Sequence, residues 1–259
     1  LKKARVLIAG LGGLGSIVSM YLAGAGVGCL VLADGDEIDI TNLHRQILYK
    51  ESDIGLDKTK AARNNLLDLN SEIEIFSINQ YLNSENLPSA LKNIDIVVDA
   101  TDNYASRYDL NRACLSRGIP IISASAQRVE GQITIIYPAL GGPCYRCLYE
   151  DTRHDAALSC SQEGILSPIL GILGSLQAYE VIRFICDFEE ALVDSILFVD
   201  LATLDFKRVK YSAKKNCPSW LCSRTEVLSV GGSGSCRSGY NTSHFEQKSK
   251  LGISREQSM

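Results

Sequence analysis

The stretch Arg5–Gly15, RVLIAGLGGLG, decides the fold. Its first half is mainly apolar and has the length of a buried strand, and a helical pattern resumes over residues 16–25. Glycines between them let the backbone turn tightly and approach a ligand. These glycines are Gly10, Gly12, Gly13 and Gly15. A strand, a glycine turn and a helix N-terminus together predict an anion site, because unpaired N–H groups and the helix dipole converge there.

The bulk composition is that of one globular domain, with or without an extension: 259 residues, 46% hydrophobic and 22% charged. A formal net charge of −4 provides no basic surface for nucleic acid or an anionic membrane. The longest apolar stretch, residues 164–184, is interrupted by Pro168 and by polar residues, which favours a buried helix over a membrane span. No signal peptide is recognisable, so we expect a cytoplasmic protein. Nine cysteines in that reducing compartment indicate metal or thiol chemistry.

Strand-like and helix-like segments alternate through the first half of the sequence. An apolar strand ends in Asp34, and it is followed by a helix over Asp57–Leu69 and by strands at Glu72–Ile78 and Ile94–Ala100. This alternation predicts an α/β fold, a Rossmann-like mixed, largely parallel sheet flanked by helices. Ligand groups are then expected at the carboxyl ends of the strands.

The second half of the chain changes to consecutive strands. We expect a helix at Tyr104–Ser116, strands at Ile119–Ala124 and Gln132–Tyr137, a long helix at Ile165–Asp187, and a hairpin made of Ser195–Leu201 and Asp205–Tyr211. From residue 223 onward the sequence is rich in Gly, Ser and Lys and has little periodicity. Residues 1–222 are therefore expected to form the domain, and residues 223–259 a disordered tail.

The glycines at residues 10–15 and Asp34 after the next strand match the fingerprint of dinucleotide-binding proteins, in which the acidic residue contacts a ribose. Taken alone, this motif indicates an NAD or FAD enzyme, and a glycine loop that binds nothing is the alternative. Arg45 and Lys58 follow close behind, and a dehydrogenase has no obvious use for them. An enzyme that transfers a group at a phosphate does use such residues, because fixed cations stabilise charge on phosphorus. A solvated loop with a salt-bridged Arg45 is the alternative.

Asp102 and Asn103 follow the strand Ile94–Ala100, at the same edge of the sheet as the glycine turn. A carboxylate at this place can hold Mg²⁺ against the phosphates of a nucleotide, since Mg²⁺ prefers hard oxygen ligands. Asp102 is also suited to cap the helix that follows. The two roles are compatible.

Two cysteine pairs, Cys144-x-x-Cys147 and Cys217-x-x-x-x-Cys222, can together form a tetrahedral zinc site with four thiolates, and unliganded thiols are the alternative. Cys160 lies in a loop before the long helix, where a thiol can act as a nucleophile if a nearby charge lowers its pKa; a tolerated loop thiol is the alternative. Three cysteines on predicted core elements are interpreted as packing residues. These are Cys29, Cys114 and Cys186.

As a set, these residues resemble the ThiF/MoeB/HesA family, relatives of the ubiquitin-activating enzymes. The matching pieces run from Arg5 to about Cys222 and include VLIAGLGGLGS, LVLADGDEIDITNLHRQIL, DIGLDK, DATDNYASRYDLN, PCYRC and GILGSLQAYE. The resemblance implies ATP-dependent adenylation of the C-terminal glycine of a ubiquitin-like sulfur carrier that ends in Gly-Gly. It also implies a homodimer.

The resemblance assigns roles to individual residues. Gly13 would lie against the phosphates, Asp34 would hold the ribose, and Asp102 would take Mg²⁺. Phosphate contacts would come from Asn42, Arg45 and Lys58. Further nucleotide contacts would come from Asp36, Thr41, Leu43, His44 and Asn103, and the catalytic set would comprise Arg45, Lys58, Asp102 and the thiol of Cys160. The attacking carboxylate is already ionised at neutral pH, so no general base is expected.

Three features depart from the pattern of the family. The helix that normally precedes the first strand, with an arginine for the partner subunit, is absent, so we expect a truncated chain or an impaired activity. Trp220 stands where the last zinc ligand is usual, so Cys222 would replace it. The sequence after Cys222 matches nothing in the family.

Within the family, residues 125–132 and 157–160 are more similar to the MoeB branch, which serves molybdopterin synthase. The ThiF branch, which activates the thiamine sulfur carrier, is the alternative, and there the thiol matching Cys160 forms a persulfide link. No rhodanese domain follows, which argues against the two-domain eukaryotic sulfurtransferases. A non-catalytic binding module and an NAD-dependent oxidoreductase are the alternatives of other classes.

Overall fold

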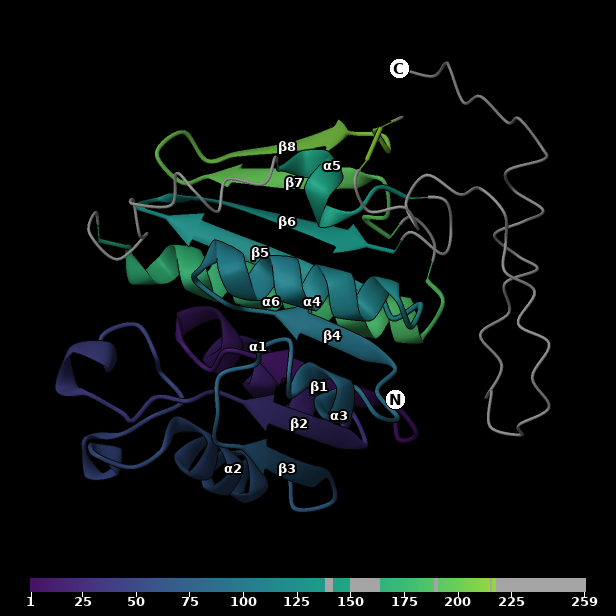
Figure 1. The fold of residues 1–259 in the computed structure, drawn as a ribbon. Helices are drawn as coiled ribbons and strands as arrows, with labels where there is room; N and C mark the ends of the chain where they lie inside the picture. The colour runs from purple at the N-terminus through teal and green to yellow at the C-terminus, as the bar shows by residue number, and fades with distance from the viewer. Residues whose placement is uncertain (138–141, 150–163, 189–190, 215, 218–259) are drawn as a thin grey trace, which may run out of the picture. The chain divides into compact units, whose positions relative to one another are not determined.

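A single mixed sheet organises the computed structural model, which describes residues 1–137, 142–149, 164–188, 191–214 and 216–217 (Figure 1). Its strands are β1 (Arg5–Ala9), β2 (Cys29–Ala33), β3 (Glu74–Ile78), β4 (Ile96–Asp99), β5 (Ile121–Gln127), β6 (Glu130–Ile136), β7 (Ser195–Asp200) and β8 (Asp205–Lys210). They lie in the order β3-β2-β1-β4-β5-β6-β7-β8. The first five strands pair in parallel and the last three pairings are antiparallel, which confirms the predicted α/β class.

Helices cover both faces of the sheet. They are α1 (Gly13–Gly24), α2 (Lys58–Leu69), α3 (Leu87–Ala90), α4 (Tyr104–Leu115), α5 (Tyr145–Leu148) and α6 (Ser167–Ile185), with 3-10 turns at Ile40–Asn42 and Glu51–Asp53. Buried side chains of α1, α2 and α6 share one hydrophobic cluster with one face of the strands. Those of α3, α4 and α5 share a second cluster with the opposite face.

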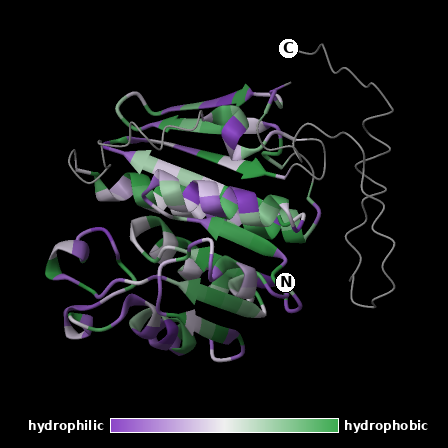
Figure 2. Cartoon of the chain, in the orientation of Figure 1, coloured by the Kyte–Doolittle hydropathy of each residue, from purple (hydrophilic) through white to green (hydrophobic). Residues whose placement is uncertain are grey.

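The central strands β1, β2 and β4 are apolar except for Arg5 at the start of β1 and Asp99 at the end of β4, because they are buried on both faces. In β1, Val6 and Ile8 belong to the first cluster, while Leu7 and Ala9 belong to the second, as the period of two in a strand requires. Figure 2 shows the same property as mainly hydrophobic colour on β1, β2 and β4. A continuous apolar run therefore predicts these strands better than an alternating one.

Helix α6 packs one face into the core. It is the one helix among the described residues that is long and apolar enough to cross a membrane, with a mean hydropathy of 1.2. Its buried polar side chains tie it to the sheet: the Nε2 of Gln177 donates to the carbonyl oxygens of Asp99 and Ile122, both at 2.8 Å. A carboxylate oxygen of Glu180 accepts from the Leu192 N–H at 3.2 Å. These contacts fit the predicted buried helix.

One of the two glycines in the first half of α6 serves packing inside the chain. A methyl group built at Gly174 would lie 2.7 Å from the Cβ of Ile17, so this glycine lets α6 approach α1 closely. Gly171, one turn earlier, has no atom within 4 Å of such a methyl group. The contact between α1 and α6 thus accounts for Gly174 within a single chain.

The expected elements are present, with shifted ends. The two segments expected to form a hairpin are β7 and β8, whereas α3 and α5, each of four residues, are not anticipated from the sequence. Cys29 and Cys114 are buried as predicted. The prediction for Cys186 is wrong: this cysteine is exposed, because it follows the last residue of α6. Residues 223–259 lie outside the described residues.

Candidate functional site

The glycine turn lies where the strand order of the sheet reverses. Neighbours on one side of β1 are β2 and then β3, and on the other side β4 and then β5, so the carboxyl ends of β1 and β4 lie at the topological switch point, where α/β proteins bind ligands. Gly10 has a positive φ of 89°, and a methyl group on it would lie 2.7 Å from the carbonyl oxygen of Ala100. The end of β1 is therefore pressed against the end of β4, which leads to Asp102.

The side chain of Asp34 holds the glycine turn by bonding to the backbone of that turn. One carboxylate oxygen accepts from the Leu11 N–H at 2.7 Å, and the other accepts from the Asp36 N–H at 2.9 Å. Burial raises the pKa of this carboxyl group, and Lys58 opposes the shift. The sequence predicts a ribose contact at Asp34 but gives no sign of this second role, the bond to the glycine turn.

The segment that carries Arg45 packs against the same turn. A methyl group at Gly13 would overlap the Leu170 side chain and lie 3.3 Å from the Arg45 carbonyl oxygen, so a side chain at position 13 would be blocked. The guanidinium NH1 of Arg45 donates to the carbonyl oxygen of Thr41 at 2.9 Å. Among the described residues the structure records no ion pair between Arg45 and a carboxylate. The guanidinium is thus held by neutral acceptors.

The residues before Arg45 shape its turn. Asp39 caps the 3-10 turn by accepting from the Thr41 N–H at 2.8 Å, and the Asn42 side chain accepts from the Asp39 N–H at 3.3 Å. Leu43 is partly buried against the core. Thr41, Asn42 and Leu43, which the resemblance assigns to nucleotide contacts, therefore have structural partners. Gln46, the residue after Arg45, is buried, and its Oε1 has no hydrogen-bond partner among the described residues.

Lys58 begins α2 and is 5% exposed. Its Nζ donates to a carboxylate oxygen of Asp36 at 2.7 Å, and the Tyr81 hydroxyl bonds the other oxygen of that carboxylate. Burial works against ionisation of Asp36, but the hydrogen bonds from Lys58 and Tyr81 hold its pKa below the ordinary value. Tyr81, which follows β3, joins the site without any recognisable motif.

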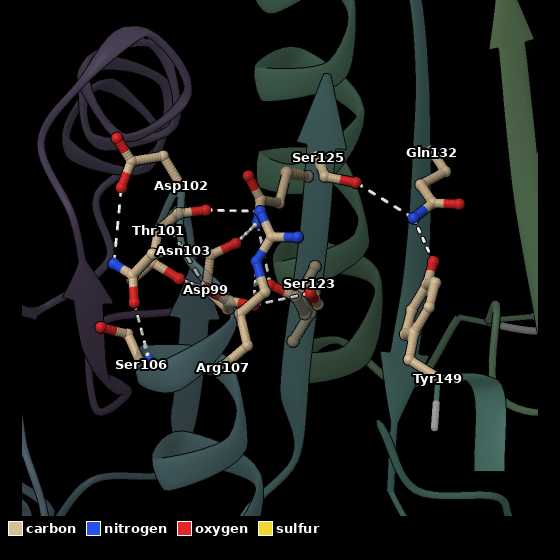
Figure 3. Close-up of polar contacts among 12 residues, drawn as sticks. Asp99, Thr101, Asp102, Asn103, Ser106, Arg107, Ser123, Ser125, Gln132 and Tyr149 are labelled. Atoms are coloured by element: carbon tan, nitrogen blue, oxygen red, sulfur yellow. Dashed lines mark hydrogen bonds and ion pairs between the residues drawn. The ribbon is translucent and has the colours of Figure 1, made fainter. Parts of the chain in front are cut away.

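Asp102 leaves its carboxylate exposed at the start of α4. Asn103 is the N-cap of this helix, because its side-chain oxygen accepts from the Ser106 N–H at 2.9 Å. The interpretation of Asp102 as the cap is therefore wrong. Among the described residues, the Asp102 carboxylate contacts the Asn103 amide at 3.5 Å, and Figure 3 shows it directed away from Arg107. An exposed carboxylate at this place remains available to a cation.

A buried network fixes the turn that leads to Asp102 (Figure 3). Asp99 is 2% exposed and accepts from the hydroxyl groups of Ser123 at 2.7 Å and Thr101 at 2.6 Å. The guanidinium of Arg107 donates to the Thr101 carbonyl oxygen at 2.5 Å and lies 3.9 Å from the Asp99 carboxylate. Neither Asp99 nor Arg107 is among the predicted site residues, although both lie in the same segment, DATDNYASRYDLN, as Asp102.

The cysteines of the two predicted pairs come together in part. The sulfur of Cys144 lies 3.9 Å from that of Cys147 and 3.5 Å from that of Cys217, and all three sulfurs lie within 4.8 Å of one another. A tetrahedral Zn²⁺ with Zn–S bonds of about 2.3 Å places its thiolates roughly 3.8 Å apart, so these separations fit zinc. The Lys214 N–H donates to the Cys147 sulfur at 3.4 Å. Cys222 and Cys160 lie outside the described residues.

A glycine turn, an exposed carboxylate and two cationic side chains lie around the switch point, an arrangement that is typical of α/β proteins that bind nucleotides. The chain belongs to the ThiF family, whose pattern its residues 1–219 match. The family membership predicted from the motifs is thereby confirmed.

Relatives in this family carry named activities. The chain is 45% identical to the adenylyltransferase and sulfurtransferase MOCS3 of Culex quinquefasciatus, over 83% of this chain and 49% of that protein. It is 40% identical to the molybdopterin-synthase adenylyltransferase of Escherichia coli, over 84% of this chain and 87% of that protein. The crystal structure of E. coli MccB with ATP has a TM-score of 0.73 and 29% identity, over 85% of this chain and 66% of MccB.

The chain spans about half the length of the MOCS3 relatives that it matches. The sequence matches only one half of each MOCS3 protein. The lack of a rhodanese domain in it is therefore no argument against the two-domain sulfurtransferases. The comparison with the E. coli adenylyltransferase agrees with the expected MoeB branch.

Proposed function

We propose that the chain catalyses ATP-dependent adenylation of the C-terminal glycine carboxylate of a ubiquitin-like sulfur carrier, of the type that serves molybdopterin synthase. The observation that carries the proposal is the packing of the Arg45 segment and of the β4 end against one glycine turn. This arrangement occurs in a chain that is 40% identical to a molybdopterin-synthase adenylyltransferase. Residues 1–222 would form the adenylation domain.

The reaction requires the site to place two anions against each other. The carrier's carboxylate oxygen would form a bond to the α-phosphorus of ATP, the bond from that phosphorus to the bridging oxygen would break, and pyrophosphate would leave. Arg45 and Lys58 would stabilise charge on the phosphates, and Gly13, the first residue of α1, would lie against them through its backbone. Asp34 would retain lone pairs for a ribose hydroxyl while it holds the turn.

Asp102 is the residue that would hold Mg²⁺ at this site. Its exposed carboxylate offers the hard oxygen ligands that Mg²⁺ prefers, and Asn103 beside it is occupied as a helix cap. The bound ion would neutralise phosphate charge. Asp99, Thr101 and Arg107 would keep the turn before Asp102 in place through the buried network.

Carrier-dependent exchange of pyrophosphate into ATP tests this function. We expect exchange with a carrier of the molybdopterin-synthase type; exchange with the thiamine carrier alone would instead identify the ThiF activity. Absence of exchange with either carrier would contradict adenylation and favour a binding module. Tight binding of NADH would support the oxidoreductase alternative.

We propose that Cys144, Cys147, Cys217 and Cys222 bind a structural zinc ion. The purified protein is then expected to contain about one zinc ion per chain. Cys144→Ser should lose that zinc and lower the melting temperature, because metal binding to such a site contributes directly to folding. Metal analysis and thermal unfolding measure both effects.

The matched control is Cys186→Ser, since Cys186 is exposed and lies apart from the cluster in the sequence. It should keep the zinc content and the melting temperature of the unaltered protein. Zinc-free purified protein, or an unchanged zinc content in Cys144→Ser, would rule the site out.

We further propose that the chain acts as a homodimer in the cytoplasm. Tyr21 of α1 and Tyr179 of α6 are 57% and 50% exposed, and Gly24 and Gly171 leave open space on the same two helices. Exposed aromatic side chains of this kind are enriched at protein interfaces. The sedimentation coefficient of the purified chain tests the dimer.

A further inference from the structure

The first turn of α6 contacts two separate parts of the phosphate site. Leu170 lies against Gly13, where it would overlap any added methyl group. Ser167, three residues earlier, bonds to His44, which immediately precedes Arg45. Ser167 and His44 are not buried, so this contact is not explained by packing of the hydrophobic core.

The donors and acceptors around His44 admit one arrangement. Its Nε2 lies 3.0 Å from the NH1 of Arg45, and an arginine only donates, so Nε2 accepts. The proton of a neutral imidazole is then on Nδ1, which lies 3.4 Å from the Ser167 hydroxyl oxygen. That hydroxyl donates its own proton to the His44 carbonyl oxygen at 2.6 Å and accepts from Nδ1. All three contacts are satisfied at once by this tautomer.

The same bonds orient the guanidinium of Arg45. NH1 donates to the Thr41 carbonyl oxygen at 2.9 Å and to the His44 ring, so both of its protons are used. The other two nitrogens keep their N–H groups, in the planar fork that suits phosphate oxygens. A guanidinium held at one nitrogen has a defined direction for the remaining donors.

We propose that His44 is a positioning residue of the adenylation site, fixed by Ser167 of α6 and acting through Arg45. This inference rests on the proposed function, in which Arg45 contacts the phosphates. His44 then supports catalysis without touching ATP, which differs from the nucleotide contact that the family resemblance implies for it. Ser167, which no motif indicates, becomes the link between α6 and the phosphate site.

The test measures pyrophosphate exchange in the full chain with a set of variants. His44→Leu removes the acceptor for Arg45, and we expect kcat to fall on the order of 10-fold, the effect of losing one hydrogen bond to a charged group. His44→Gln places an amide oxygen within reach of Arg45 and should restore kcat to within about threefold of the unaltered protein. Ser167→Ala should give a smaller loss, and adding it to His44→Leu should cause no further loss.

Two further variants make the outcome decisive. Ser175→Ala, on the same helix, removes a hydroxyl whose hydrogen bond among the described residues is to the Gly171 carbonyl oxygen at 2.6 Å, and it should leave kcat unchanged. Arg45→Ala reports the role of the guanidinium itself. Thermal unfolding of each variant separates a loss of stability from a loss of rate, and rescue by glutamine excludes a purely structural effect.

The results distinguish this inference from the proposed function. Reduced exchange in Arg45→Ala together with unchanged exchange in His44→Leu would overturn the positioning role alone. Equal losses of exchange activity in His44→Leu and His44→Gln would also overturn the positioning role, because the hydrogen bond to Arg45 would then not account for the loss. Unchanged exchange in Arg45→Ala would contradict the phosphate role of Arg45, and the positioning role with it.

Discussion

Replacement of Asp102 by alanine is expected to reduce carrier-dependent pyrophosphate exchange at least about 100-fold, because the site loses the carboxylate that would hold Mg²⁺ against the phosphates. The fold should be unaffected. Asn103, not Asp102, caps α4, and the carboxylate of Asp102 is exposed. Exchange rates and thermal unfolding of the same protein preparation measure the two effects.

Asp109→Ala is the matched control, since it removes another carboxylate from α4. Asp109 accepts from Arg112 at 2.8 Å, and this ion pair of partly exposed groups contributes little to stability. Its exchange rate should equal that of the unaltered chain. If Asp102→Ala keeps its activity, or if it loses activity only by unfolding, Asp102 does not hold the metal.

Gly15→Ala is expected to destabilise the protein by about 3 kcal/mol, at the upper end of the range for overpacking. A methyl group at this position would overlap the carbonyl oxygen of Gly10 and lie 2.9 Å from the carbonyl carbon. Gly10 cannot move away easily, because it is itself pressed against Ala100. The free energy of unfolding in urea, compared at equal m values, measures the change.

Gly24→Ala, at the other end of α1, is the control. Nothing lies within 4 Å of a methyl group there, and Gly24 has no positive φ. Because alanine has a higher helix propensity than glycine, this variant should be unchanged or more stable by up to about 1 kcal/mol. Equal unfolding free energies for Gly15→Ala and Gly24→Ala would show that the close approach of the turn to α1 is unimportant.

The architecture could be predicted from the sequence because its strands have a local signature. Strands β1, β2 and β4 are buried on both faces, so each is a nearly unbroken apolar run, and the glycines after β1 indicate where the chain must turn. Elements α3 and α5 have no such signature. A helix of four residues is not stable by its own propensity and forms through tertiary contacts, which a local pattern does not contain.

The site was predictable only as far as its residues lie in motifs. Arg45, Lys58 and Asp102 stand in recognisable segments, whereas some of the partners around them come from elsewhere in the chain. Tyr81 reaches Asp36 from 45 residues away, and Ser167 reaches His44 from 123 residues away. Such pairs depend on how loops meet at the edge of the sheet. The choice between Asp102 and Asn103 as the cap likewise depends on the backbone conformation at one residue.

The ion pair between Lys58 and Asp36 has a consequence for how the site meets its nucleotide. Lys58 is 5% exposed, so its ammonium group has already given up most of its water when the chain folds. Removing water from a charged group costs free energy. For Lys58 this cost arises during folding, and the Asp36 carboxylate 2.7 Å away compensates for it. Under the proposed function, a phosphate that binds would not have to remove water from the Lys58 ammonium. The phosphate and the Asp36 carboxylate would both accept hydrogen bonds from that ammonium.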